Sequence, residues 1–205
     1  LHYNLQEDKM SASNLIENEV LKTIKARRSV RAYEPKKIPR EIIKTIIEAG
    51  NNAPSAMNSQ PWRFVVVEGE ALHKKMLDTA VPNAKILFAP LKTTNPERYQ
   101  VIMKRHEELE DPIYYSAPAI IFVIGKGTYA DLSCPLACEN IMLSAYSLGL
   151  GSCWVQFGSL ITDNEDIKKA LDLKADEKIF GPIVMGYPKT IPEPPQKKAP
   201  EIKWL

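Results

Sequence analysis

The sequence predicts an α+β fold, in which helices and strands interleave irregularly along the chain. Some segments repeat apolar residues at helical spacing, and others are short continuous runs of β-branched residues typical of buried strands. These segments do not form a clean β-α-β series, so we assign α+β and not α/β. With 205 residues, 44% of them hydrophobic, the chain can bury one sizeable core, and we expect residues 15–205 to form a single domain.

Charge and hydropathy exclude several classes of protein. The 27 basic and 25 acidic residues leave a net charge of +2, so we expect no nucleic-acid partner. No apolar run approaches the roughly 20 residues that span a bilayer, and we expect no membrane association. The polar N-terminus lacks the apolar core of a signal peptide. Met10 is a candidate natural start, which would make residues 1–9 an artificial leader.

The three cysteines, Cys134, Cys138 and Cys153, indicate a reducing compartment. An odd, low count argues against a disulfide framework, and we expect a cytoplasmic protein. Cys134 and Cys138 are four residues apart on a predicted helix. With no histidine or second cysteine pair nearby, they read as small buried apolar residues, and we expect no metal site.

The N-terminal third predicts two helices, a loop and a strand. Apolar residues recur at helical spacing over residues 15–26, which predicts an amphipathic helix. Pro39 suits the first position of a second helix, which carries an isoleucine stripe and has Gly50 as its expected stop. A polar loop over residues 51–61 follows. The run at 64–67 then predicts a fully buried strand.

The middle third is harder to interpret. Residues 70–80 have a helical pattern, but residues 81–97 contain three prolines and no clear period, which predicts a long loop suited to act as a lid. Residues 97–109 predict a charged, exposed helix. Residues 119–124 predict a second buried strand, and residues 132–148 a long helix buried on most sides and ended near Gly149.

Two more strands are predicted in the last third, at 152–157 and 179–185. Between them, Thr162 and Glu165 form a capping box that would open a short helix over residues 163–171.

Residues 187–205 form a proline-rich tail that ends in the apolar Ile202 and Trp204. Such a segment has no internal hydrogen bonds. It is either a disordered tail or an extended arm, and we favour an arm whose end docks on a partner subunit by adding a strand.

A basic cluster follows the first predicted helix: Arg27, Arg28, Ser29 and Arg31. Guanidinium groups present rigid charged forks suited to phosphate oxygens, and the serine adds a small donor. The alternative is that these cations only complement the helix dipole.

The loop from Asn52 to Trp62 is rich in amides and hydroxyls. Amide side chains both donate and accept, which suits the edge of a heterocycle. The alternative is an ordinary polar connector with Trp62 as core filler.

Standard catalytic patterns are absent from the sequence. Trp154 stands where a dinucleotide fingerprint starting at Gly149 would need its third glycine. His73 and His106 read as surface residues, and no Ser/His/Asp order can be argued. We expect no catalytic side chain, and an organic cofactor is the natural source of any difficult chemistry.

Four segments together resemble the nitroreductase family of FMN-dependent oxidoreductases, and the match runs from about residue 20 to 203. They are residues 27–31, residues 53–62, residues 148–154, and Gly186-Tyr187-Pro188 with the tail that carries Lys197 and Lys198. The resemblance implies a three-layer sandwich with a central, mostly antiparallel sheet flanked by helices. It also implies a homodimer with exchanged C-terminal arms and FMN at the subunit interface.

The resemblance assigns the site residues. Those expected to hold the phosphate and ribityl end of FMN are Arg27, Arg28, Ser29 and Arg31, with Lys197 or Lys198 approaching from the tail. Those expected to line the isoalloxazine from the other subunit are Pro54, Ser55, Asn58 and Gln60. Those expected along the other edge of the ring, where a backbone N–H faces the flavin N5, are Trp154, Val155 and Gln156.

The implied activity is hydride transfer from NAD(P)H through flavin N5 to an electron-poor acceptor, by a ping-pong mechanism. The acceptor would be a nitroaromatic, a quinone or an activated alkene. Two alternatives stay open: reductive dehalogenation of halogenated tyrosine-like substrates, and a flavin-binding carrier or sensor without turnover. The choice between NADH and NADPH also stays open.

Overall fold

A computed structural model describes residues 16–205, so the proposed start at Met10 lies outside the described part of the chain. Its centre is an antiparallel sheet of four strands in the order β1-β2-β4-β3. The strands are β1 (Trp62–Val67), β2 (Ala119–Lys126), β3 (Gly151–Trp154) and β4 (Glu177–Gly186).

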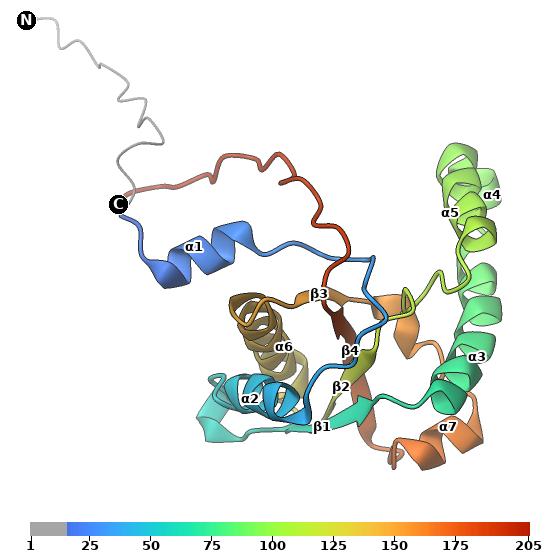
Figure 1. Ribbon diagram of the computed structural model, residues 1–205, viewed down its shortest axis with the longest axis horizontal. Helices are drawn as coiled ribbons and strands as arrows, with labels where there is room; N and C mark the ends of the chain where they lie inside the picture. The colour runs from blue at the N-terminus through green and yellow to red at the C-terminus, as the bar shows by residue number, and fades with distance from the viewer. Residues whose placement is uncertain (1–15) are drawn as a thin grey trace, which may run out of the picture.

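Helices cover both faces of the sheet, which confirms the α+β class and the three layers (Figure 1). The helices α2 (Arg40–Asn51) and α6 (Ala130–Ser147) pack on one face, against inward residues such as Ile121 and Ile183. The opposite face carries α3 (Glu70–Phe88) and α7 (Glu165–Ala170), packed against residues such as Phe122.

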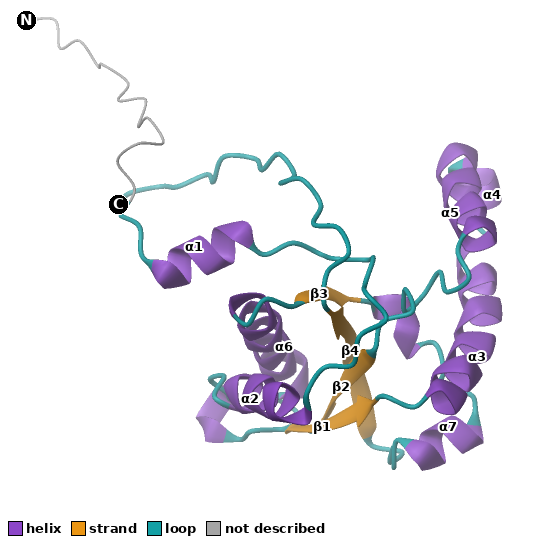
Figure 2. Cartoon of the chain, in the orientation of Figure 1, coloured by secondary structure: helices purple, strands orange, loops and turns teal. Residues whose placement is uncertain are grey.

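The first helix and the C-terminal arm extend away from these layers (Figure 2). Helix α1 (Glu19–Ala26) begins after Asn18, whose side chain accepts a hydrogen bond from the Leu21 N–H at 2.9 Å. Its apolar face is exposed, with Val20 at 65% of its maximal accessibility. The arm is extended and exposed, and Trp204 near its end is 88% exposed.

The expected loop over residues 81–97 is wrong, because this stretch is mostly helical. Helix α3 continues through Pro82 to Phe88, and α4 (Leu91–Thr94) and α5 (Pro96–Glu108) follow. Pro82 lies on the exposed side of α3, where water can satisfy the carbonyl that its missing N–H leaves free. The buried stripe of α3 has a spacing of four and is half alanine, so it gives a weak hydropathy signal: Met76, Ala80, Ala84 and Phe88.

The strand at 64–67 is not fully buried as expected. It belongs to β1, which among the described strands pairs with β2 alone and so lies at the edge of the sheet. Within β1 only Val67 is buried. The strand at 119–124 is buried on both faces as predicted.

Gly50 is not a helix stop, and Thr162 is not a helix cap. Gly50 lies in the last turn of α2, where an added Cβ would come within 2.7 Å of Ile141 on α6. Helix α7 is instead capped by Asn164, whose side chain accepts from the Ile167 N–H at 3.2 Å. The strand expected at 152–157 ends at Trp154, and a short 3₁₀ turn, η3 (Gln156–Ser159), follows.

Helix α6 matches its prediction closely and ends where Gly149 adopts a positive φ of 77°. Cys134 and Cys138 are free and buried within it. Burial raises the pKa of the Cys134 thiol to about 11, so the group stays protonated. Among helices of residues 16–205, none combines the length and apolarity that a bilayer crossing requires.

Candidate cofactor-binding site

The basic cluster runs along the β3 edge of the sheet. After α1 the chain becomes extended, Ser29 bridges Ser152, and the Val30 N–H donates to the Ser152 carbonyl at 3.0 Å. Gly151 makes this approach possible, since a Cβ there would lie 2.7 Å from Val30. The predicted first and third segments of the site therefore meet in one place.

A cavity of about 240 Å³ opens beside this junction. Its lining comprises Arg27, Arg28, Val30, Tyr146, Gly149, Leu150, Gly151, Ser152, Pro188 and Ile191. No carboxylate is among these residues.

Two buried polar atoms of the lining have no hydrogen-bond partner: Arg27 Nη1 and Ser152 Oγ. Buried polar groups are nearly always paired, so orphans of this kind call for a ligand. A guanidinium N–H and a hydroxyl both donate well to phosphate oxygens. The residues present thus fit the phosphate end of the expected FMN.

The other two arginines are partly used within the chain. Arg28 Nη1 donates to the carbonyls of Lys25 and Arg27, at 2.6 and 2.8 Å, near the end of α1. Arg31 Nη1 donates to the Ser29 carbonyl at 3.2 Å. The helix-dipole interpretation therefore applies to Arg28, and it does not account for the unpaired nitrogen of Arg27.

The amide-rich loop lies at the opposite edge of the sheet, where it leads into β1. The Gln60 N–H donates to Ser55 Oγ at 3.0 Å, and Gln60 Nε2 donates to Asn58 Oδ1 at 3.2 Å. Met57, Asn58 and Gln60 all have positive φ angles, so the loop is held in a strained conformation. Pro54 and Ser55 precede this strained stretch. Within one chain, the structure does not bring this loop to the arginine cluster.

Trp62 is not mere core filler, because its indole N–H donates to Asn51 Oδ1 at 3.0 Å. The side chain thereby ties the end of α2 to the start of β1.

Residues 154–156 continue from β3, so they lie at the same edge as Ser152. Trp154 Nε1 donates to Gln156 Oε1 at 3.1 Å. The Val155 N–H donates to the Pro182 carbonyl at 2.8 Å, so this particular N–H is already engaged.

The arm starts beside the cavity and then leaves it. The Lys189 N–H donates to the Ala32 carbonyl at 2.9 Å, and Pro188 and Ile191 contribute to the lining. Lys197 and Lys198 lie further along the exposed arm and are not among the lining residues.

The two central histidines are not surface residues, which corrects the sequence expectation. His73 Nε2 lies 2.7 Å from the buried Asp111 carboxylate, and the His106 ring packs edge-on against Phe88. Burial lowers the pKa of His106, and the nearby charges of Lys85 and Arg105 act in the same direction. His73 and Asp111 are 38 residues apart, so no local pattern could have joined them.

A three-layer α+β sandwich with a guanidinium-lined cavity at one sheet edge defines a protein suited to hold a phosphate-bearing ligand. The model of the nitroreductase family matches residues 24–187. The chain belongs to the nitroreductase family.

Known proteins resemble this chain over most of its length. A Bacteroides fragilis nitroreductase solved with bound FMN is 31% identical, with a TM-score of 0.74 over 92% of this chain and 100% of that one. A Desulfitobacterium hafniense nitroreductase with bound FMN has a TM-score of 0.78 at 26% identity, over 93% and 100% of the two chains. An Archaeoglobus fulgidus protein, provisionally named NADH dehydrogenase/NAD(P)H nitroreductase, is 30% identical over 83% of this chain and 86% of its own.

Proposed function

We propose that this protein is an FMN-dependent oxidoreductase that passes hydride from NADH or NADPH to an electron-poor acceptor. The observation that carries the proposal is the pair of unpaired buried groups, Arg27 Nη1 and Ser152 Oγ, in a cavity free of carboxylates. Family membership and the FMN in two relatives support it. The buried free cysteines fit a reducing cytoplasm, where we expect the protein to act.

The side chains bind and orient, and bound FMN would supply the hydride chemistry. Arg27, Arg31 and Ser29 would hold the phosphate and ribityl end, with Ser152 donating from the strand. Trp154 and Gln156 would flank the ring. Because donor and acceptor would use the same place in turn, we expect ping-pong kinetics.

We propose that two copies pair to complete each site. The loop with Pro54, Ser55, Asn58 and Gln60 lies at the sheet edge opposite the arginine cluster, so a single chain holds two separate halves. The exposed apolar face of α1 and the exposed Ile202 and Trp204 offer surfaces for pairing. FMN would then lie at the interface, with the arm and Lys197 or Lys198 crossing to the partner.

The deciding experiment is an anaerobic reductive titration of the purified, FMN-loaded protein. NADH or NADPH should bleach the flavin absorbance near 450 nm within seconds, and a quinone should restore it. If neither NADH nor NADPH bleached the flavin over many minutes, the result would favour the carrier or sensor function instead. Protein that is colourless and takes up no added FMN would end the proposal altogether.

Reductive dehalogenation is a second candidate, favoured by one relative. A Thermotoga neapolitana protein named iodotyrosine deiodinase is 26% identical over 80% of this chain and 86% of its own. The stretch where a lid was expected is helical, and its charged residues, including Lys92 and Arg98, are exposed. Iodide release from 3-iodotyrosine by the dithionite-reduced protein would support this candidate, and its absence would remove it.

A further inference from the structure

A strained turn at Tyr115 and Ser116 lies beside Arg31, the last arginine of the basic cluster. Tyr115 and Ser116 are consecutive non-glycine residues with positive φ angles, 58° and 50°. Residues other than glycine rarely adopt positive φ angles, and such backbone strain persists only where the surrounding structure enforces it. The turn connects α5 to β2 and belongs to neither element.

A buried carboxylate enforces the turn. Asp111 accepts the N–H groups of Tyr114 at 2.6 Å and Ser116 at 2.9 Å, and His73 Nε2 lies 2.7 Å from it. The Tyr114 hydroxyl donates to the Gly158 carbonyl at 2.8 Å. Burial opposes the charged form, but the hydrogen bonds from His73, Ser116 and Tyr114 hold the pKa of Asp111 below its usual value.

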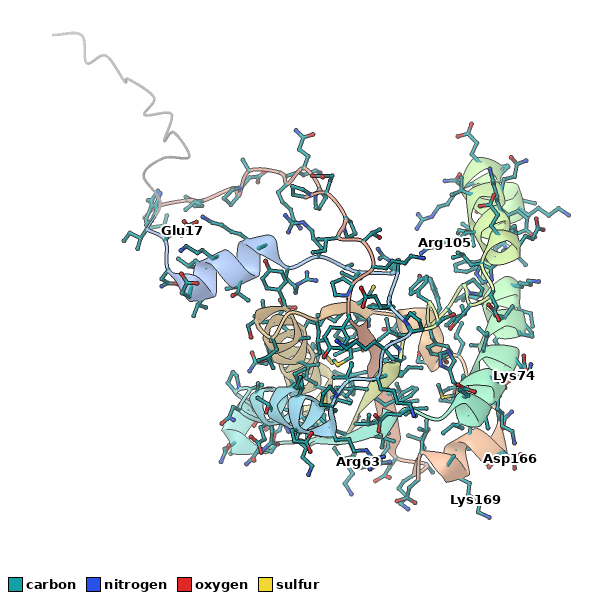
Figure 3. The ribbon with its side chains drawn as sticks, viewed as in Figure 1. Glu17, Arg63, Lys74, Arg105, Asp166 and Lys169 are labelled. Carbon is teal, nitrogen blue, oxygen red and sulfur yellow. The ribbon has the colours of Figure 1, made fainter. Side chains whose placement is uncertain are left out.

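The turn places the Tyr115 ring near Arg105 of α5 and near Arg31 of the extended segment after α1. The Arg105 guanidinium carbon lies 4.9 Å from the centre of this ring, on the side of α5 that faces the rest of the molecule (Figure 3). Burial raises the pKa of Tyr115, and the charges of Arg105 and Arg31 oppose that rise. Burial likewise raises the pKa of the Cys153 thiol, one residue before Trp154, and the charges of Arg31 and Arg105 oppose that rise.

Within the described part of the chain, neither Arg31 nor Arg105 has an acidic partner. Among the ion pairs within residues 16–205, Arg31 and Arg105 do not occur, whereas nearby Lys104 pairs with Glu108 at 3.6 Å. Arg105 is also not a lining residue of the phosphate cavity. Arg105 therefore lies against a fixed aromatic ring that packs on the apolar cluster containing Cys153 and Val155, beside the residues expected at the flavin ring.

We propose that Arg105, held on Tyr115, is a specificity-determining residue that recognises a carboxylate on the acceptor substrate. The proposal rests on the oxidoreductase function above and names its substrate class: aromatic acceptors that carry an anionic group. A guanidinium fork matches a carboxylate in two-point geometry, and stacking on Tyr115 preorients the fork.

The test compares Arg105→Gln and Arg105→Lys with a control one residue away, Lys104→Gln, which removes the same charge from an exposed surface pair. The readouts are kcat/KM for 4-nitrobenzoate relative to nitrobenzene, and the Kd of unreactive benzoate measured from the flavin difference spectrum. Benzoate binding requires no turnover, so it is independent of hydride transfer.

Arg105→Gln should lower the 4-nitrobenzoate to nitrobenzene ratio about tenfold, through KM, and weaken benzoate binding by a similar factor. Arg105→Lys should recover part of the loss, and Lys104→Gln should match wild type. An equal loss on both acceptors, or a shifted flavin midpoint potential with unchanged benzoate binding, would overturn the proposal. Wild-type flavin that NADH or NADPH cannot bleach would instead overturn the oxidoreductase function.

Discussion

The Ser152 hydroxyl is buried on β3 and has no hydrogen-bond partner among residues 16–205. A buried hydroxyl without a partner destabilises the fold. Its presence is therefore best explained by a ligand that completes its bonding. Arg27 Nη1, in the same cavity, is a buried charged donor that also has no hydrogen-bond partner, and a bound ligand explains it in the same way.

Replacing Ser152 should separate ligand binding from folding. We expect Ser152→Ala to weaken FMN binding by about fivefold to tenfold, while the apo-protein becomes more stable by up to roughly 1 kcal/mol, because an unpaired polar group is removed. Flavin fluorescence titration and urea unfolding of apo-protein measure the two quantities. Unfolding that becomes easier, with FMN affinity unchanged, would show that the hydroxyl serves the fold.

A second residue-scale prediction concerns the ion pair of Arg63 and Glu177. Arg63 Nε and Nη2 donate to the two carboxylate oxygens at 2.8 and 2.7 Å, and Arg63 also reaches the Asp172 carbonyl at 2.8 Å. The hydrogen bond from Arg63 is the main cause that lowers the pKa of Glu177 to about 2. The pair joins β1 to the end of α7 and the start of β4.

Because the folded-state pKa of Glu177 is depressed, its contribution to stability is complete above about pH 4.5 and is lost as the pH falls towards 2. Glu177→Gln should lower the free energy of unfolding by roughly 1.5–3 kcal/mol at pH 7 and by nearly nothing at pH 2. Urea unfolding across this range measures it. The control is Asp78→Asn, which breaks the exposed pair with Lys74 and should change stability by less than about 1 kcal/mol at any pH.

At the scale of elements, the contact between α2 and α6 depends on a missing side chain. A Cβ at Gly50 would lie 2.7 Å from Ile141 Cγ1 and 3.4 Å from the Ala137 carbonyl. Ile141 is fully buried and cannot swing aside. Gly50 therefore sets how closely the two helices approach.

Gly50→Ala should destabilise the protein by up to about 2 kcal/mol, since overpacking costs about 1–3 kcal/mol and helix propensity returns roughly 1 kcal/mol. Thermal unfolding measures the change. Gly69→Ala is the control for an added Cβ without a clash, because a Cβ there meets nothing within 4 Å. Gly69 is the N-cap of α3, where alanine is less favourable than glycine, so the loss should stay below about 1 kcal/mol and should not respond to Ile141→Val. Adding Ile141→Val should recover part of the loss, and no recovery would place the strain elsewhere.

Elements with a dense apolar signal were predictable, and those stabilised by distant contacts were not. Residues 119–124 and 132–148 carry nearly unbroken apolar runs, so β2 and α6 were found close to their bounds. The continuation of α3 past Pro82 was missed for two reasons. Its buried stripe is half alanine, which gives a weak hydropathy signal, and its proline, normally a helix breaker, lies on the solvent-exposed face.

The candidate site divides in the same way. The phosphate-binding role of residues 27–31 could be predicted because the three arginines and the serine lie within five consecutive residues. Ser152 and Arg105 were not identified, since their significance comes from burial and from a ring contributed by another element. His73 and Asp111 likewise meet only because the chain between them folds back.

At the scale of the whole molecule, the exposed apolar surfaces of α1 and the arm predict a second copy. Deleting residues 193–205 leaves Pro188 and Ile191 in the cavity lining but removes Ile202 and Trp204. We expect the shortened protein to become monomeric and to lose most of its FMN, as measured by light scattering and absorbance. Lys203→Ala should stay dimeric, and a shortened protein that remains dimeric would show that the arm does not hold the pair.

The placement of the arginine cluster and the amide loop on opposite sheet edges has a genetic consequence. One allele with Arg27 and Arg31 replaced by alanine, and another with Ser55, Asn58 and Gln60 replaced, should each be inactive alone. Coexpressed, they should complement one another, because a mixed pair contains one fully intact catalytic pocket and one doubly damaged one. Random assortment of equal amounts would restore about a quarter of normal activity, an outcome that independent self-sufficient chains could not produce.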